Sequence, residues 1–267
     1  MGNDDAPIGR ILSRREVLML FGVTFATACA PAALTSPSPS ALRTGAPATA
    51  AGSAGASAAA PAAGSPTIAS PQCVVVPALT EGPYFVDEKL DRSDIRADAG
   101  GGAARPGAQL DLVIQVGRVS GAGCAALQGA TVDVWHCDAL GVYSDATDPS
   151  FTTKGQKWLR GSQTTDASGV ARFTTIYPGW YRGRAVHIHF KVRVPSGSRT
   201  ADFTSQFFFD EALNEKVFAT SPYSQKGASG RLHNERDDIY RQSNGKTQLN
   251  VTQNGSVYAA TFSLGIA

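Results

Sequence analysis

Alternation of apolar and polar residues along this chain predicts a series of short β-strands. Successive side chains of a strand point to opposite faces, so a period of two marks a strand with one face on a core. Clusters of Gly, Pro, Ser and Asp separate these stretches and indicate turns. The stretches are residues 110–116, 130–136, 170–176, 184–194, 206–209 and 256–264. The fold class that this pattern predicts is all-β, an antiparallel β-sandwich.

Long irregular segments accompany these strands. Residues 137–169 and 195–255 show little alternation, and only the short stretch 210–219 within them looks helical. Long loops in a compact domain usually carry function. We therefore expect a sandwich with long functional loops.

The first 28 residues have the order of an export signal. A basic head with Arg14 and Arg15 precedes an apolar stretch over residues 17–28, which ends in Ala26-Thr27-Ala28. That order predicts a signal peptide over residues 1–28, and the paired arginines indicate the twin-arginine route. The apolar stretch is shorter than the roughly 18 residues that a membrane-spanning helix needs. We expect an exported protein, extracellular or in the periplasm and cell envelope.

Residues 29–71 predict a disordered tether. They are nearly all Ala, Pro, Ser, Gly and Thr, with Arg43 as the only charge. Such a segment cannot bury enough apolar surface to offset its ordering entropy. Cleavage after Ala28 would place Cys29 first, as in a bacterial lipoprotein, but Ala26 stands where a leucine is usual. A lipid anchor through Cys29 and simple release both stay open. The folded domain is expected over residues 72–267.

Composition excludes several classes of protein. Hydrophobic residues make up 42% and charged residues 17%, with a net charge of +2, so we expect no nucleic-acid partner. Four cysteines are too few and too unevenly spaced for a disulfide scaffold or a zinc cluster. Without Cys29, at most one disulfide can form among Cys73, Cys124 and Cys137.

The strand over residues 184–194 carries the candidate chemistry. Its even-numbered residues from Val186 onward are apolar, whereas its odd-numbered residues include His187 and His189. The apolar face must pack on the core, so the two histidines point away from it, side by side. Side chains two residues apart on a strand project in parallel, so both imidazoles can reach one metal ion. Two surface histidines would also match this short motif.

Two tyrosines can reach the same face. Tyr181 follows the turn at Pro178-Gly179, six residues before His187, so it can swing back over the histidines. Tyr143 follows a bend that Gly141 permits. Taken singly, either tyrosine also fits a half-buried packing residue.

Taken together, these motifs resemble the intradiol ring-cleavage dioxygenases, over about residues 73–264. The resemblance rests on Val132-Asp133-Val134 followed after six residues by Gly141-Val142-Tyr143, on Tyr177-Pro178-Gly179-Trp180-Tyr181-Arg182-Gly183-Arg184-Ala185-Val186-His187-Ile188-His189-Phe190, on Thr80-Glu81-Gly82-Pro83-Tyr84 with Arg92-Ser93-Asp94-Ile95-Arg96, and on Ser205-Gln206-Phe207-Phe208-Phe209.

The resemblance implies an iron centre, Fe(3+), and a set of site residues. The implied metal ligands are Tyr143, Tyr181, His187 and His189. The implied catalytic residues are Arg184 beside the substrate, Tyr181, and Gln206 lining the site. The implied substrate-binding residues are Gly82, Pro83 and Tyr84. Two tyrosinates and two neutral imidazoles suit hard iron(III), whereas zinc usually draws on Cys, His and carboxylates.

The resemblance also implies a reaction. A catechol and dioxygen would be the small-molecule partners, and the ring would open between its two hydroxylated carbons to a cis,cis-muconic acid derivative. One tyrosine would leave the metal and act as a general base. Tyr143 or Tyr181 could fill this role, and its place on a turn favours Tyr181. The identity of the catechol and a homodimeric state stay open.

Two rival interpretations remain at this stage. The turn at residues 166–169 and the Pro178-Gly179-Trp180-Tyr181 segment also resemble transthyretin-like modules, which would make the chain a non-catalytic binding module on the cell surface. A zinc hydrolase could use His187 and His189 but would need a third ligand. We expect His136 and Cys137 to be structural and His233 to lie on a solvated loop. Arg184 could instead pair with an acid such as Asp138.

Overall fold

The computed structural model describes residues 74–121, 123–196 and 199–266. The predicted signal segment (1–28) and tether (29–71) lie outside the described residues, as do Cys29 and Cys73. In the described part of the chain, no helix is long and apolar enough to cross a bilayer.

One sheet is built around β1 (Gln109–Ser120). On one side β1 pairs in parallel with β11 (Val257–Ile266), which in turn pairs with β10 (Val251–Asn254). On its other side β1 pairs antiparallel with β7 (Val170–Ile176) and then β2 (Gly123–Ala126). The β1–β11 pair departs from a purely antiparallel arrangement, because β11 returns after a long excursion rather than through a hairpin.

The second sheet has the order β6-β3-β8-β9, and all of its pairs are antiparallel. Its strands are β6 (Arg160–Thr164), β3 (Thr131–Trp135), β8 (His187–Ser196) and β9 (Arg199–Phe208). A small ribbon pairs β4 (Thr147–Asp148) with β5 (Phe151–Thr152). These β-sheets, with few helices, confirm the predicted all-β sandwich.

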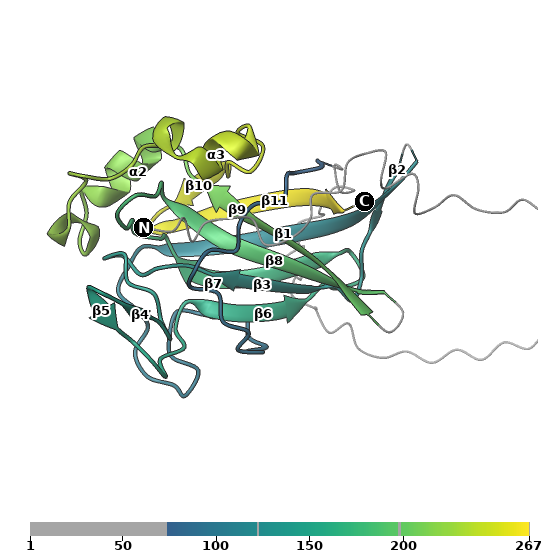
Figure 1. Ribbon diagram of the computed structural model, residues 1–267, viewed down its shortest axis with the longest axis horizontal. Helices are drawn as coiled ribbons and strands as arrows, with labels where there is room; N and C mark the ends of the chain where they lie inside the picture. The colour runs from purple at the N-terminus through teal and green to yellow at the C-terminus, as the bar shows by residue number, and fades with distance from the viewer. Residues whose placement is uncertain (1–73, 122, 197–198, 267) are drawn as a thin grey trace, which may run out of the picture. The chain divides into compact units, whose positions relative to one another are not determined.

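Two short helices lie in the long connection between β9 and β10. The predicted helix is α2 (Glu211–Phe218), which Asp210 caps by accepting a hydrogen bond from the Leu213 amide. A second helix, α3 (Asp238–Ser243), and two single turns, η1 (Tyr223–Gln225) and η2 (Asn234–Arg236), were not predicted. Figure 1 shows α2 and α3 at the same end of the sheets as the β4–β5 ribbon.

The core lies between the two sheets. Leu110, Leu112 and Ile114 of β1 alternate into it, and so do Ile188 and Phe190 of β8. Burying such a side chain stabilises the fold by about 1.5–3 kcal/mol. The prediction that the apolar face of β8 packs on the core and its histidine face points away is therefore confirmed.

The histidine face of β8 is nevertheless not exposed to water. The chain segment 79–95 crosses the sandwich and is held by backbone bonds such as Leu79 N to Thr204 O (2.9 Å) and Ile95 N to Thr174 O (3.0 Å). Beneath it, His187 and His189 are only 2% and 1% exposed. The site is thus an internal layer between one sheet and the N-terminal segment.

Candidate active site

The two histidines of β8 aim at a common point. Their Nε2 atoms lie 3.0 Å apart, and His187 Nδ1 lies 2.6 Å from the carbonyl oxygen of Ala185. A carbonyl oxygen only accepts, so the His187 proton sits on Nδ1 and its Nε2 carries a lone pair. Histidines that bind metals in proteins are held in the same way.

Burial keeps both imidazoles neutral at pH 7. It lowers the pKa of His187 to about 3, and the charge of Arg184 adds to this effect. Burial, then His187, then Arg184 lower the pKa of His189 well below its usual value. Neutral imidazole is the form that binds metal ions.

The ring of His189 is fixed by packing. It stacks on Trp135 at a centroid distance of 4.9 Å and an interplanar angle of 8°. Its Cε1 would lie 3.2 Å from a Cβ at Gly82, where φ is +71°, so only glycine fits easily there. Within the described residues, His189 Nδ1 has no hydrogen-bond partner.

Register across the second sheet gathers further side chains beside His189. Trp135 and Gln206 lie directly opposite it on the neighbouring strands, and Arg160 lies opposite Trp135 on β6. Because directly paired residues share a face, four strands contribute one side chain each to a single row.

Both predicted tyrosines reach the histidines. Tyr143 Oη lies 3.5 Å from His187 Nε2, and the ring of Tyr181 lies 5.6 Å from that of His187. The two tyrosine rings meet edge to face at 5.6 Å and 77°. The structure thus brings the four predicted ligands together, while their role as ligands stays a prediction.

Close contact between two loops positions these tyrosines. Gly141 has φ +84°, and a Cβ there would lie well inside 3.0 Å of the Trp180 carbonyl oxygen. Lys226 Nζ donates to the carbonyl oxygens of Leu140 (2.8 Å) and Trp180 (2.6 Å). The glycine therefore permits both the predicted bend and the approach of the loop that carries Tyr181.

These donors fit a ferric ion. Two nitrogens that each lie about 2.1 Å from one ion at a right angle are about 3.0 Å apart, as the two Nε2 atoms are. Burial and the neighbouring Tyr181 raise the pKa of Tyr143 well above its usual value. A trivalent cation beside the phenol would offset that cost and hold the tyrosinate form.

No group of three or more His, Cys, Asp or Glu side chains is placed to hold a metal in the described residues. A zinc hydrolase built on His187 and His189 would need such a third ligand. The pair instead has phenol oxygens beside it, and these are donors that iron(III) favours.

Arg184 belongs to a buried hydrogen-bonded network. Its Nε donates to Asp237 Oδ2 (3.0 Å), and its Nη2 donates to Gln206 Oε1 (2.7 Å). Gln206 Nε2 donates in turn to the Thr80 carbonyl oxygen (2.8 Å). Arg184 Nη1 is buried and has no partner in the described residues.

The alternative that Arg184 pairs with an acid is confirmed, but the acid is not Asp138. Asp138 pairs with Arg105, and it also accepts from the Leu140 and Val142 amides. Arg184 has its ion pair with Asp237 instead.

Tyr84 covers the two tyrosines from the N-terminal segment. Its ring stacks on Tyr143 at 4.5 Å and meets the edge of Tyr181 at 5.9 Å, and its hydroxyl donates to Asp148 Oδ2 (2.7 Å). A cavity of about 850 Å³ opens beside it, and its lining includes Tyr84, Leu140, Asp148, Phe151, Trp180, Tyr181, Arg182 and Lys226. Gly82 lies against His189, as described above, whereas Pro83 is exposed.

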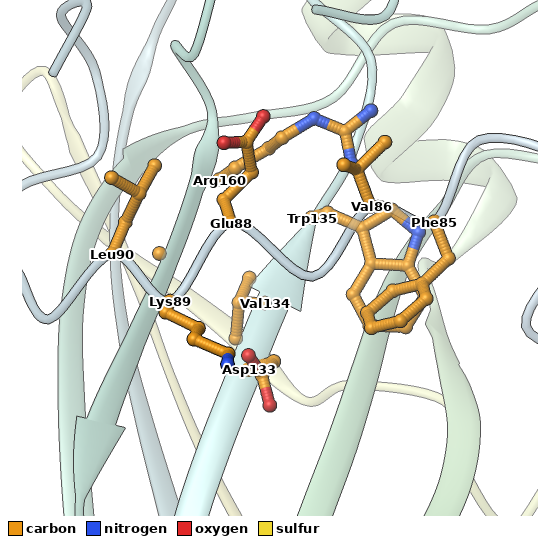
Figure 2. A pocket seen from close by; sticks show the side chains of 10 residues that line it. Phe85, Val86, Glu88, Lys89, Leu90, Asp133, Val134, Trp135 and Arg160 are labelled. Atoms are coloured by element: carbon orange, nitrogen blue, oxygen red, sulfur yellow. The ribbon is translucent and has the colours of Figure 1, made fainter. Parts of the chain in front are cut away.

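A second, water-sized cavity of about 10 Å³ lies beside Trp135. Figure 2 shows its lining, with Phe85 packed against the indole (centroids 4.7 Å apart). Glu88 Oε1, Trp135 Nε1 and Arg160 Nη1 belong to this lining, and each is buried without a partner among the described residues. Polar atoms around a space of this size commonly hold one water molecule.

The other reactive residues take structural places. His136 is buried, with Nδ1 2.8 Å from the Cys137 carbonyl oxygen and Nε2 2.7 Å from Thr175 Oγ1. The His233 side chain is 47% exposed. Cys137 is free and buried, and Cys124 is disulfide-bonded. The predicted pairings that involve Cys73 lie outside the described residues.

Sequence reasoning missed several residues of this site. Asp237 and Trp135 contact the side chains of Arg184 and His189. Arg160 and Lys226 bond to backbone carbonyl oxygens of the two loops that carry the tyrosines. An Asp before a short polar helix is a helix-start signal, and this could have identified the N-cap role of Asp237. Nothing local indicated its contact with Arg184.

Comparisons with known proteins agree with this geometry. The model of the family described as Dioxygenase (Dioxygenase_C) matches residues 80–244. The chain is similar to Catechol 1,2-dioxygenase 2 of Acinetobacter lwoffii, with 29% identity over an alignment of 154 residues, and the match covers 42% of this chain and 54% of that protein. The chain thus matches about half the length of this curated relative.

Solved structures match over more of their length. An intradiol ring-cleavage dioxygenase from Tetranychus urticae is 30% identical with a TM-score of 0.61, over 73% of this chain and 94% of that one. The dioxygenase domain of a dioxygenase carbohydrate-binding protein fusion from Streptomyces sp. SirexAA-E is 26% identical with a TM-score of 0.51, over 72% and 98%. These findings do not favour the transthyretin-like alternative. The chain belongs to the intradiol ring-cleavage dioxygenase family.

Proposed function

We propose that this protein is a non-haem iron(III) dioxygenase that opens a catechol ring between its two hydroxylated carbons. Both atoms of dioxygen would enter the cis,cis-muconate-type product, so no separate reductant is required. One observation carries the proposal: two neutral imidazoles and two tyrosines meet beside a buried guanidinium, whose Nη1 has no partner in the described part of the chain.

The metal ligands in this proposal are Tyr143, Tyr181, His187 and His189. A ferric ion bound there would supply the Lewis acidity that makes a catechol ring reactive toward dioxygen. The two histidines are neutral and the two tyrosines can be anionic, so the protein would offset most of the ion's charge within a buried site.

Tyr181 is the better candidate for the proton acceptor. It is half-buried and lines the larger cavity, whereas Tyr143 is only 1% exposed and lies beneath Tyr84. A substrate that enters through the cavity would meet Tyr181 before Tyr143. The phenolate of Tyr181 would then take a proton from a substrate hydroxyl.

Arg184 would stabilise negative charge that develops on the ring. Two of its three guanidinium nitrogens are held by Asp237 and Gln206, and Nη1 has no partner among the described residues. A cation fixed in this way costs little reorganisation when charge develops near it.

The larger cavity favours an uncharged catechol. Its wall includes the rings of Tyr84, Phe151 and Tyr181, which can pack against an aromatic ring, and the carboxylate of Asp148. Asp148 already accepts hydrogen bonds from Tyr84 and Ser150, and the cations Arg182 and Lys226 also line the cavity. The preference therefore rests on the aromatic wall, which can bind a catechol that carries no carboxylate.

Oxygen uptake by the iron-loaded protein tests this function. We expect consumption of dioxygen with unsubstituted or alkyl-substituted catechols, with appearance of a muconate-type product in the ultraviolet spectrum. Tyr181→Phe should bind iron more weakly and turn over at least 100-fold more slowly. Iron-loaded protein that consumes no dioxygen with any catechol would contradict the function. Turnover of carboxylated rings alone would contradict only the substrate preference.

We also propose that the protein is exported and that residues 1–28 are removed. The basic head, apolar stretch and small residues before Cys29 support this. Mass spectrometry of protein from the cell envelope and medium should find an N-terminus at Cys29, with or without lipid. An intact Met1 in all fractions would exclude removal of the signal.

A further inference from the structure

We propose that Asp237 is a positioning residue that orients Arg184 and His187 together. The inference rests on the proposed function. In it, the carboxylate of Asp237 orients Arg184 on the substrate side of the site and His187 on the metal side. Asp237 lies 53 residues after Arg184 and 52 residues after Ala185 in the chain, and it is 1% exposed.

The two oxygens of Asp237 have different tasks. Oδ2 accepts from Arg184 Nε (3.0 Å) and from the Ala185 amide (2.7 Å). Oδ1 accepts from the amides of Ile239 (2.7 Å) and Tyr240 (3.2 Å) at the start of α3. Each oxygen thus accepts two hydrogen bonds, which uses the capacity of a carboxylate. This arrangement suits holding other groups rather than exchanging protons.

On the substrate side, Asp237 selects which nitrogen of Arg184 is left free. The guanidinium is planar, so bonds at Nε to Asp237 and at Nη2 to Gln206 fix both its plane and its rotation. Nη1 is the remaining nitrogen, and it is buried without a partner in the described residues. Loss of the Asp237 bond would let the group rotate away from that direction.

On the metal side, the connection runs through one residue. Asp237 holds the amide of Ala185, and the carbonyl oxygen of Ala185 lies 2.6 Å from His187 Nδ1. That bond sets the tautomer and ring direction of His187. The N-terminus of α3 is therefore linked to an imidazole through Asp237 and a single backbone residue.

Asp237→Asn separates these tasks. The amide oxygen can still cap α3, whereas its NH2 group would face two N–H donors in place of Oδ2. We expect kcat to fall 10–100-fold and iron release to a chelator to quicken by a similar factor, as for other residues that orient metal ligands. The visible absorption of the iron-loaded variant should shift. A crystal structure of the metal-free variant should show a displaced Arg184 guanidinium.

Asp210→Asn is the matched control. Asp210 caps α2 through the Leu213 amide, and within the described part of the chain its side chain bonds to no side chain of the site. We expect its kcat and iron release to stay within about twofold of wild type, because Asn caps a helix as well as Asp does. This control separates loss of a charged cap from loss of the contact with Arg184.

Asp237→Ser is a second variant, since Ser also caps helices but is too short to keep both contacts of Oδ2. A folded Asp237→Asn or Asp237→Ser protein with wild-type kcat, spectrum and iron release would overturn the proposal. The proposal would also be overturned if neither Asp237 variant folds while Asp210→Asn does. In that case the role of Asp237 would be to stabilise the fold. A wild-type protein that binds no iron would instead contradict the proposed function.

Discussion

Neighbouring histidines in this site are held by different means. A hydrogen bond from Nδ1 to Ala185 fixes His187, whereas stacking on Trp135 and the close approach of Gly82 fix His189. The first depends on backbone that Asp237 anchors and the second on side chains of other strands. The short motif of two histidines indicated a metal pair but carried no information about either support.

Asp133 is buried on the same face of the second sheet as His189, and its burial makes the stability of the protein depend on pH. Burial raises the pKa of Asp133 to about 6, although Arg193 lies 3.3 Å away and opposes the shift. The folded protein then holds this proton more tightly than the unfolded chain does. The stability from this group is full below about pH 4 and is lost as pH rises through about 6.

Asp133→Asn removes that titration. We expect the substitution to change the free energy of unfolding differently at the two pH values. It should be more stabilising at pH 8 than at pH 3.5, by on the order of 2 kcal/mol. Denaturant unfolding at both pH values measures it. An effect of Asp133→Asn that is equal at both pH values would contradict the assignment.

At the scale of elements, the register of one sheet and the contact of two loops build the site. β6, β3, β8 and β9 place Arg160, Trp135, His189 and Gln206 in one row. The loops that carry Tyr143 and Tyr181 meet at Gly141 and Trp180, and Lys226 bonds to both. The tyrosines are therefore positioned by loop packing rather than by strands.

Gly141→Ala tests that packing. It adds a Cβ that overlaps the Trp180 carbonyl, at a residue with φ +84°. Gly155→Ala is the control, because Gly155 also has φ +84° but nothing lies within 4 Å of its Cβ position. We expect Gly155→Ala to cost about 1–2 kcal/mol of unfolding free energy from backbone strain alone. Gly141→Ala should cost more and also weaken iron binding, and equal costs would contradict the role of the loop contact.

Strands with clear alternation were predictable, and those without it were not. β7 occupies the residues predicted for it, and β1 extends the predicted 110–116 at both ends. β8 begins at His187, three residues later than predicted, because Asp237 holds the backbone at Ala185. β2, β4, β5, β6 and β10 are short or polar, so pairing rather than pattern defines them.

The candidate site was predictable where function depends on nearby residues. Local spacing indicated the His pair, and glycine turns indicated that both tyrosines could reach it, whereas their role as ligands was implied by the family resemblance. Asp237 and Trp135 do not, because their roles arise from contacts with residues about 50 positions away. The parallel pairing of β11 with β1 likewise joins residues far apart in the sequence, such as Leu110 and Tyr258, which only folding brings together.

Across the whole molecule, the site exists only when distant parts of the chain come together. The N-terminal segment contributes Tyr84 and Gly82, β3 and its loop contribute Trp135 and Tyr143, and β8 contributes the histidines. An unfolded chain would lack this arrangement, so binding of an ion to it would favour the folded state.

Metal removal should therefore lower thermal stability. We expect the Tm of the iron-loaded protein to exceed that of the metal-free protein by several degrees, since free ligand at about 1,000 times Kd stabilises by about 4 kcal/mol. Differential scanning calorimetry with and without a chelator measures the shift. His187→Ala should abolish most of it, and an equal Tm with and without iron would contradict binding at a site formed by folding.

The claim that two tyrosines and two histidines bind iron is tested by visible absorption spectra. These compare the iron-loaded wild type with iron-loaded Tyr143→Phe and Tyr181→Phe. Two tyrosinates on iron(III) predict a strong burgundy charge-transfer band in the wild type that weakens or shifts in each variant. A folded, iron-loaded wild type without that band, or with a band that neither substitution alters, would contradict a centre built from these two phenols and two imidazoles.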